Sequence, residues 1–153
     1  MDLRNVLSRI QLSAGQFDAA LANCGRVVAE DPDFPFAEEY CARALAAKGR
    51  TDEALALFNK RPLYNEHGIG YVYAITGRRA EAELLAARNA HLPNRQALIY
   101  AGLGDKDRAF EALERLALQN PRRAGAYLNY PELTALRGDP RVQTLRSRLG
   151  FDQ

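Results

Sequence analysis

The residue types that most often carry out chemistry are sparse in this chain, and their spacing fits no catalytic or metal-binding pattern. The histidines are His67, which follows Glu66, and His91. A zinc-protease helix needs two histidines four residues apart with a glutamate beside the first, and the sequence lacks that spacing. No serine or cysteine has a base placed beside it by the sequence. We therefore expect no catalytic residues, no metal site and no cofactor.

A pair of glycines offers one further candidate, a phosphate-binding loop. Gly68-Ile69-Gly70 resembles part of such a loop. A phosphate loop follows a strand and carries a lysine after its last glycine, and the sequence around these residues predicts neither feature. Glycine costs about 1 kcal/mol in a helix interior relative to alanine. We interpret Gly70 instead as a position at which a neighbouring helix packs closely.

The two cysteines, Cys24 and Cys41, are 17 residues apart. This spacing is neither a redox CxxC motif nor a zinc-binding pattern. Both residues fall on the apolar faces of expected helices, where a free cysteine behaves as a small hydrophobic residue. We therefore predict two buried free thiols.

Charge and hydropathy restrict the partners that the chain is expected to bind. The net charge is +2, and 26% of the residues are charged. The C-terminal region is rich in arginine, so a nucleic-acid surface is one interpretation. Because the whole chain is nearly neutral and few aromatic residues lie among these arginines, a solvated helix face is the better interpretation. The chain has no run of 18 apolar residues and no charged-then-apolar leader, so we expect a cytoplasmic protein with no membrane partner.

A recurrent spacing of glycine and alanine indicates the elements that position these side chains. An alanine follows a glycine by five residues at four places: Gly15 and Ala20, Gly49 and Ala54, Gly77 and Ala82, and Gly104 and Ala109. Glycine adopts at low cost the left-handed conformation that ends a helix. A small residue one turn into the next helix lets two antiparallel helices approach closely. The pattern predicts helix, tight turn and helix, four times over.

The apolar periodicity predicts an all-α fold. Apolar residues recur at helical spacing over about residues 2–14, 17–30, 34–48, 52–61, 63–76, 79–90, 93–103 and 105–119. The segment that contains Tyr127 and Tyr130 is less regular. Asp139-Pro140 then starts a last helix, because an N-cap residue followed by proline is typical of a helix start. Runs of valine, isoleucine and threonine that would favour strands are missing.

These features together resemble the tetratricopeptide repeat. The step from Gly15 to Gly49 is 34 residues, and Asp31-Pro32 closes the first unit. Other positions also match the family's small and aromatic residues: Phe17, Gly70, Tyr73, Ala97 and Tyr100. The first helix matches less well. The resemblance implies a right-handed superhelical array of four helix pairs over about residues 2–32, 34–62, 63–91 and 93–121, with residues 122–153 as a C-terminal capping segment.

The tail has a resemblance of its own. It is similar to the closing segment of many bacterial repeat domains at Pro131, Leu133, Leu136, Arg137, Asp139, Pro140, Arg141, Leu145, Arg148 and Leu149. Those domains often end larger signalling proteins, such as winged-helix transcription regulators, adenylate cyclases and serine/threonine kinases. This resemblance implies a bacterial signalling context. It also implies an alternative function, a C-terminal sensory or oligomerisation domain that recognises a small effector or its own copies.

The family resemblance implies a binding face as well. In tetratricopeptide-repeat proteins the first helices of the pairs line a concave face, which usually binds a peptide. Carried over by position, that face comprises Asn5, Arg9, Phe36, Glu39, Arg43, Tyr64, His67, Tyr71 and Asn94. The lysine pattern of the family's carboxylate clamp is missing. The alternative, that these are ordinary surface or packing residues, stays open.

Aromatic and arginine side chains are the types that anchor protein interfaces. A partner peptide would fit this set by placing a carboxylate on Arg9 or Arg43 and an apolar side chain near Tyr71. We therefore expect a non-catalytic scaffold or adaptor module that binds a protein or peptide partner on its concave face. Self-association is a further partner that the sequence leaves open.

Overall fold

The computed structural model describes residues 3–34 and 36–151, with the backbone alone at residues 4 and 5. Within these residues the chain is helical and contains no strand, which confirms the all-α helical repeat array. The elements are α1 (Leu3–Ser13), α2 (Phe17–Glu30), α3 (Ala37–Ala47), α4 (Thr51–Phe58), α5 (Glu66–Ile75), α6 (Arg79–Arg88), α7 (Pro93–Gly102), α8 (Lys106–Gln119), α9 (Pro121–Tyr127), the 3-10 helix η1 (Pro131–Leu136) and α10 (Pro140–Arg148).

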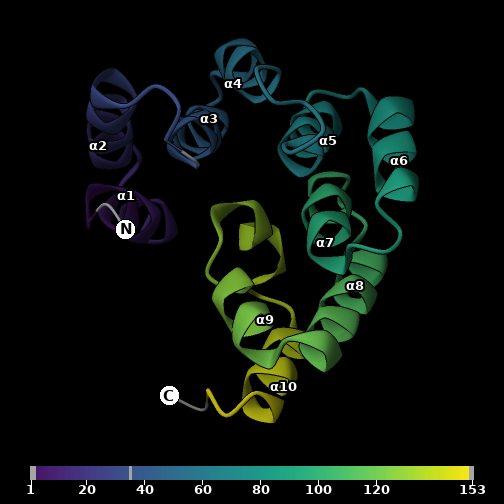
Figure 1. Cartoon of the computed structure of the whole chain (residues 1–153). Helices are drawn as coiled ribbons and strands as arrows, with labels where there is room; N and C mark the ends of the chain where they lie inside the picture. The colour runs from purple at the N-terminus through teal and green to yellow at the C-terminus, as the bar shows by residue number, and fades with distance from the viewer. Residues whose placement is uncertain (1–2, 35, 152–153) are drawn as a thin grey trace.

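The helices follow a curve, so that the array has an inner and an outer side. Figure 1 shows α1, α3, α5 and α7 along the inside of the curve and α2, α4 and α6 along the outside. The yellow-green segment between α9 and α10, which contains η1, returns into the inside of the curve (Figure 1). Among the described residues, no helix combines the length and apolar character needed to span a bilayer.

The predicted turns are confirmed. The four recurrent glycines have φ angles of 76°, 77°, 82° and 73°, which is the left-handed region that favours glycine. The four alanines that follow them have no exposed surface, as close packing of the paired helices requires: Ala20, Ala54, Ala82 and Ala109. The local pattern therefore fixes both the ends of the helices and the contacts within each pair.

The close approach predicted at Gly70 is also confirmed. A Cβ atom at Gly70 would lie 2.6 Å from Cδ1 of Ile99 on α7. Gly68 has the same property, because a Cβ atom there would lie 2.4 Å from the ring of Phe58 on α4. Helix α5 thus gives up helix propensity to pack directly against its neighbours on both sides.

Two helix starts differ from the predictions for local reasons. Helix α3 begins at Ala37 rather than near residue 34, because Phe36 has a left-handed backbone with a φ of 73°. Helix α5 begins at Glu66 rather than near residue 63. The residue before it, Asn65, has its side chain turned to α4, where Nδ2 donates a hydrogen bond to the carbonyl oxygen of Phe58 at 3.1 Å. Both differences fall beside the inner face, at the two aromatic side chains of Phe36 and Tyr64.

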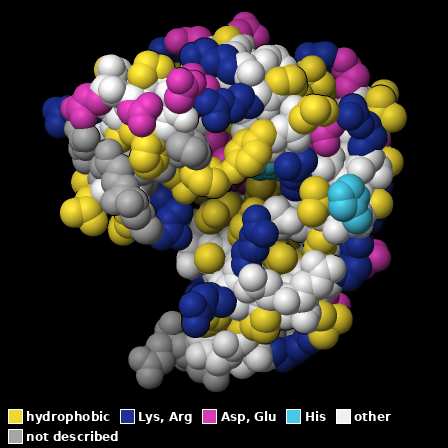
Figure 2. All heavy atoms as spheres, viewed as in Figure 1, with side chains coloured by type: hydrophobic (Ala, Val, Ile, Leu, Met, Phe, Trp, Pro, Cys, Tyr) yellow, Lys and Arg dark blue, Asp and Glu magenta, His cyan; other side chains and the backbone are white. Residues whose placement is uncertain are grey.

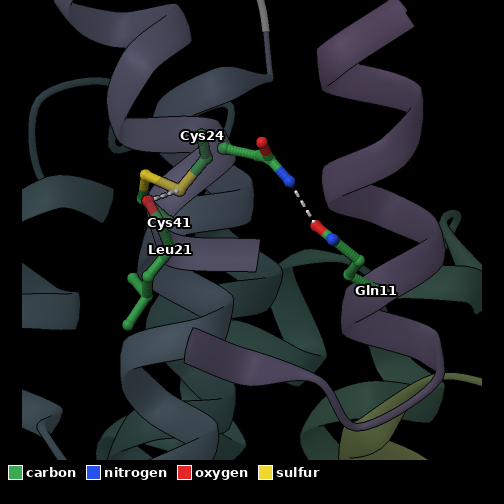
Figure 3. Close-up of a disulfide and its surroundings, with 5 residues drawn as sticks. Gln11, Leu21, Cys24 and Cys41 are labelled. Atoms are coloured by element: carbon green, nitrogen blue, oxygen red, sulfur yellow. Dashed lines mark hydrogen bonds between the residues drawn. A yellow bond between two sulfur atoms is a disulfide. The ribbon is translucent and has the colours of Figure 1, made fainter. Parts of the chain in front are cut away.

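The prediction of two free thiols is wrong. Cys24 on α2 and Cys41 on α3 form a disulfide, and their Cα atoms are 5.6 Å apart (Figure 3). Short cysteine motifs do not reveal this pair, because the two residues meet only where α2 and α3 pack side by side. On the other side of α2, Nδ2 of Asn23 donates to Oε1 of Gln11 on α1, at 2.6 Å (Figure 3). The disulfide joins the first expected helix pair to the second.

The C-terminal elements belong to the largest apolar core. Leu133 and Leu136 of η1 and Val142 and Leu145 of α10 are buried together with the apolar residues of α7 and α8. The tail therefore supplies buried surface to the last expected pair, and it also supports the segment that turns into the inside of the curve.

Candidate functional site

One hollow on the inner side of the curve is lined from five helices or the residues beside them, namely α1, α3, α5, α7 and α9. We call it the central hollow. Its volume is about 320 Å³, and its lining comprises Arg9, Phe36, Glu39, Tyr40, Arg43, Tyr64, His67, Asn94, Arg95, Arg123, Ala126, Tyr127 and Tyr130. Figure 2 shows basic and hydrophobic side chains around a hollow in the middle of this face.

The structure brings together most of the residues expected on the concave face. Seven of the nine line the central hollow: Arg9, Phe36, Glu39, Arg43, Tyr64, His67 and Asn94. Tyr71 instead lines a second hollow of about 300 Å³, which also includes Arg43 and Glu132. The side chain of Asn5 lies outside the described residues. That these residues bind a partner stays a prediction.

A buried ion pair separates the two hollows. Nε and Nη2 of Arg43 donate to the two carboxylate oxygens of Glu132, at 2.6 and 2.9 Å. The guanidinium also lies 4.1 Å from the ring centre of Tyr130. Burial alone would lower the pKa of Arg43, but the charge and hydrogen bonds of Glu132 raise it above its ordinary value. A partner carboxylate that enters the central hollow therefore finds Arg43 already paired.

The chain's own C-terminal segment thus forms part of the inner face, a contact that the repeat pattern of the sequence does not predict. The segment contributes Glu132 and also a pair of stacked rings, Tyr127 and Tyr130, whose centres are 4.4 Å apart. Nδ2 of Asn94 on α7 donates a hydrogen bond to Oη of Tyr127 at 3.1 Å. One signal for this segment was present in the sequence. Asn120 followed by proline is a helix start, and its side chain does cap α9 by accepting from the backbone N–H of Arg123.

Two polar groups on the wall of the central hollow are paired with each other. Oε1 of Glu39 lies 3.2 Å from Nε2 of His67, and both side chains are largely buried. Burial would raise the pKa of Glu39, but the hydrogen bond and charge of His67, together with Arg43 and Arg95, lower it overall. Glu39 is therefore an ionised group whose charge is balanced within the protein.

The remaining arginines of the central hollow differ in how far they are engaged. Arg95 donates to the carbonyl oxygens of Leu63 and Tyr64, at 3.2 and 3.1 Å, and to Oδ1 of Asn89 at 3.0 Å. Its guanidinium therefore holds the chain that precedes α5. Arg9 and Arg123 are less engaged than Arg43 and Arg95, because neither pairs with a carboxylate among the side chains that the structure describes.

An aromatic pair stands at the rim of the central hollow. The rings of Phe36 and Tyr64 meet edge to face with centres 5.7 Å apart, and the two residues are 47% and 45% exposed. A smaller hollow of about 180 Å³ lies on their other side and includes Phe34. The left-handed backbone of Phe36 is uncommon for a bulky residue and costs of the order of 1 kcal/mol. The protein thus exposes apolar rings at a strained position.

The site offers charge and apolar surface but no cluster suited to a metal. Within the described ranges, no group of three or more histidine, cysteine, aspartate or glutamate side chains could hold an ion. The groups that the hollow presents are guanidinium groups, which can bind anions, and exposed rings, which can bind apolar groups.

The curved array of helix pairs with an inward-facing hollow defines a helical repeat protein. Two stretches, residues 11–78 and 95–122, match family models of the tetratricopeptide repeat. The chain therefore carries tetratricopeptide repeats, a type of repeat that generally mediates interactions between proteins. No curated protein and no solved structure matches this chain.

Proposed function

We propose that this chain is a non-catalytic scaffold or adaptor module that binds a peptide or a segment of a partner protein in the central hollow. The repeats place the hollow on the inner side of the array, where side chains from several repeats act on one ligand. Aromatic and arginine side chains, which dominate its lining, are also the types enriched among the residues that contribute most to binding energy.

The observation that carries this proposal is the exposed pair of Phe36 and Tyr64. Two large rings that are nearly half exposed at the edge of an arginine-lined hollow would be better buried against a partner. A strained backbone at Phe36 is consistent with selection for the position of its ring rather than for stability.

Site-specific photo-crosslinking tests the proposal. The photoreactive residue p-benzoylphenylalanine replaces Tyr64 in the full chain, and in a matched control it replaces Leu84, which is 62% exposed on the outer helix α6. In cells of the source organism we expect crosslinks to a distinct protein from position 64 and none from position 84. Equal crosslinking from both positions, or crosslinking from position 84 alone, would contradict the proposal.

The alternative function, a sensory or oligomerisation domain of a bacterial regulator, draws support from one observation. The volume of the central hollow, about 320 Å³, lies at the lower end of the range typical of small-molecule sites. Copies of the chain crosslinked to one another from position 64 would favour self-association.

The disulfide argues against the cytoplasmic location expected from the sequence, because a disulfide such as Cys24–Cys41 usually persists in an oxidising compartment.

A further inference from the structure

We infer that the ligand of the central hollow is an acidic peptide segment, with a carboxylate bound between Arg9 and Arg123 and an adjacent apolar side chain against Phe36 and Tyr64. This inference rests on the proposed function and adds the chemical class of the partner to it. Two observations support it. Two arginines of the hollow lack a carboxylate partner among the described side chains, and the pair of Arg123 and Tyr127 resembles the pair of Arg43 and Tyr130 but has no acid bound to it.

The balance of charge in the hollow leaves two cations over. Four arginines face it: Arg43 pairs with Glu132, and Arg95 lies 3.6 Å from a carboxylate oxygen of Glu66 and also donates to main-chain oxygens. Glu39, the acidic residue in its lining, is paired with His67. Arg9 on α1 and Arg123 on α9 therefore face the hollow without a carboxylate among the described side chains. Two cations directed at one space favour an anion in that space.

The chain itself shows how this face holds a carboxylate. Arg43 lies over the ring of Tyr130 and binds Glu132 with two hydrogen bonds. Arg123 also faces the ring of Tyr127, at the longer distance of 5.7 Å to the ring centre, and Tyr127 stacks on Tyr130. The second arginine and tyrosine thus repeat the first, but without the acid. A carboxylate from a partner would complete the second arrangement with the geometry that arginine prefers.

The surroundings favour a peptide over a nucleic acid. Exposed rings and arginines suit both ligands, but a nucleic acid needs a basic surface that extends well beyond one hollow, and the whole chain carries a net charge of only +2. The hollow of about 320 Å³ also has room for only a short segment.

Selection from a random peptide library tests the inference directly. Phage-displayed peptides of 12 random residues are selected on the full chain, and the most enriched peptide is synthesised with a fluorescent label. Its affinity is then measured by fluorescence anisotropy for wild type, for Arg9→Glu/Arg123→Glu and for the control Arg26→Glu/Arg122→Glu. The control makes the same change of net charge as the test variant. Its two arginines, Arg26 and Arg122, are exposed and lie outside the lining of the hollow.

We expect aspartate or glutamate beside an apolar residue in the enriched peptides. The Arg9→Glu/Arg123→Glu variant should bind at least about tenfold more weakly, as is typical for the loss of arginine anchors, while the control stays within about threefold. The charge-retaining variant Arg9→Lys/Arg123→Lys should keep the acidic preference with reduced affinity, because lysine lacks the planar fork of donors. Thermal melts by circular dichroism show whether each variant is folded. If the double glutamate variant unfolds, the single variant Arg123→Glu decides, because Arg123 is exposed.

The contradicting outcomes separate this inference from the proposed function. Enriched peptides that are neutral or basic, or acidic peptides whose affinity is unchanged in Arg9→Glu/Arg123→Glu, would overturn the acidic ligand and leave peptide binding in place. A labelled single-stranded DNA of 20 nucleotides that displaces every selected peptide would replace the peptide with a nucleic acid. If no peptide is enriched, the proposed function fails and the inference fails with it.

Discussion

Removal of the Glu132 carboxylate should strongly destabilise the protein. In the substitution Glu132→Ala, Arg43 loses both of its carboxylate hydrogen bonds and keeps its contact with the ring of Tyr130. The Arg43 side chain is 2% exposed, so water cannot replace the lost partner. A buried charge without its partner costs about 3–5 kcal/mol, a large part of the stability of a single domain.

Urea denaturation of three variants measures this effect. Glu132→Ala should lower the free energy of unfolding by about 3–5 kcal/mol. The control Glu114→Ala removes an exposed glutamate that lies 3.7 Å from Arg148, and it should cost less than about 1 kcal/mol. The double variant Arg43→Met/Glu132→Leu removes both charges at similar volume and should recover most of the loss.

The three variants together can refute the reasoning. A loss below about 1 kcal/mol for Glu132→Ala would mean that solvent reaches Arg43 and that the ion pair is not a buried one. A double variant that is no more stable than Glu132→Ala would mean that the cost does not come from an unpaired cation. Either result would mean that Arg43 and Glu132 do not show how this face holds a carboxylate.

Three further predictions test other parts of the structure. Gly70→Ala should lower the free energy of unfolding by about 1–3 kcal/mol because its Cβ would clash with α7, whereas Gly25→Ala, with open space around it, should raise it by about 1 kcal/mol; both are measured by urea denaturation. Cys41→Ala should cost about 3 kcal/mol by the same measurement, and a denatured, unreduced wild-type chain that reacts with iodoacetamide would contradict the disulfide. Because the pKa of Glu39 is lowered on folding, its ionised form stabilises the protein above the ordinary value of 4.5, and this contribution is lost as the pH falls through the lowered pKa. Glu39→Gln should therefore flatten the loss of stability between about pH 5 and 3, and an unchanged pH profile would contradict the pairing with His67.

The repeat architecture was predictable because its signals are local. A turn glycine such as Gly49 and the small residue Ala54 lie five positions apart, and their spacing alone determines a helix end and a close helix contact. The same holds for prolines at helix boundaries. A pattern repeated four times makes such local signals robust, so nearly all of the helix pairs follow from the sequence.

The features that the sequence did not predict depend on contacts between distant residues. Arg43 and Glu132 are 89 positions apart, and nothing near either residue indicates that the tail returns into the curve. The disulfide likewise depends on the packing of α2 against α3 rather than on a motif. For the site, the family resemblance selected side chains on the inner helices, and seven of the nine line one hollow. It could not show that Arg43 is paired internally or that Arg123 from α9 joins the same hollow.

The binding face itself is the central claim, and an NMR titration tests it most directly. The full chain labelled with ¹⁵N is titrated with the most enriched peptide from the library selection, and the backbone amide shifts are followed. The account predicts that the largest shifts lie around Arg9, Tyr64 and Arg123, which come from helices or turns that border the central hollow. Shifts concentrated on the outer helices α2, α4 and α6 would contradict it.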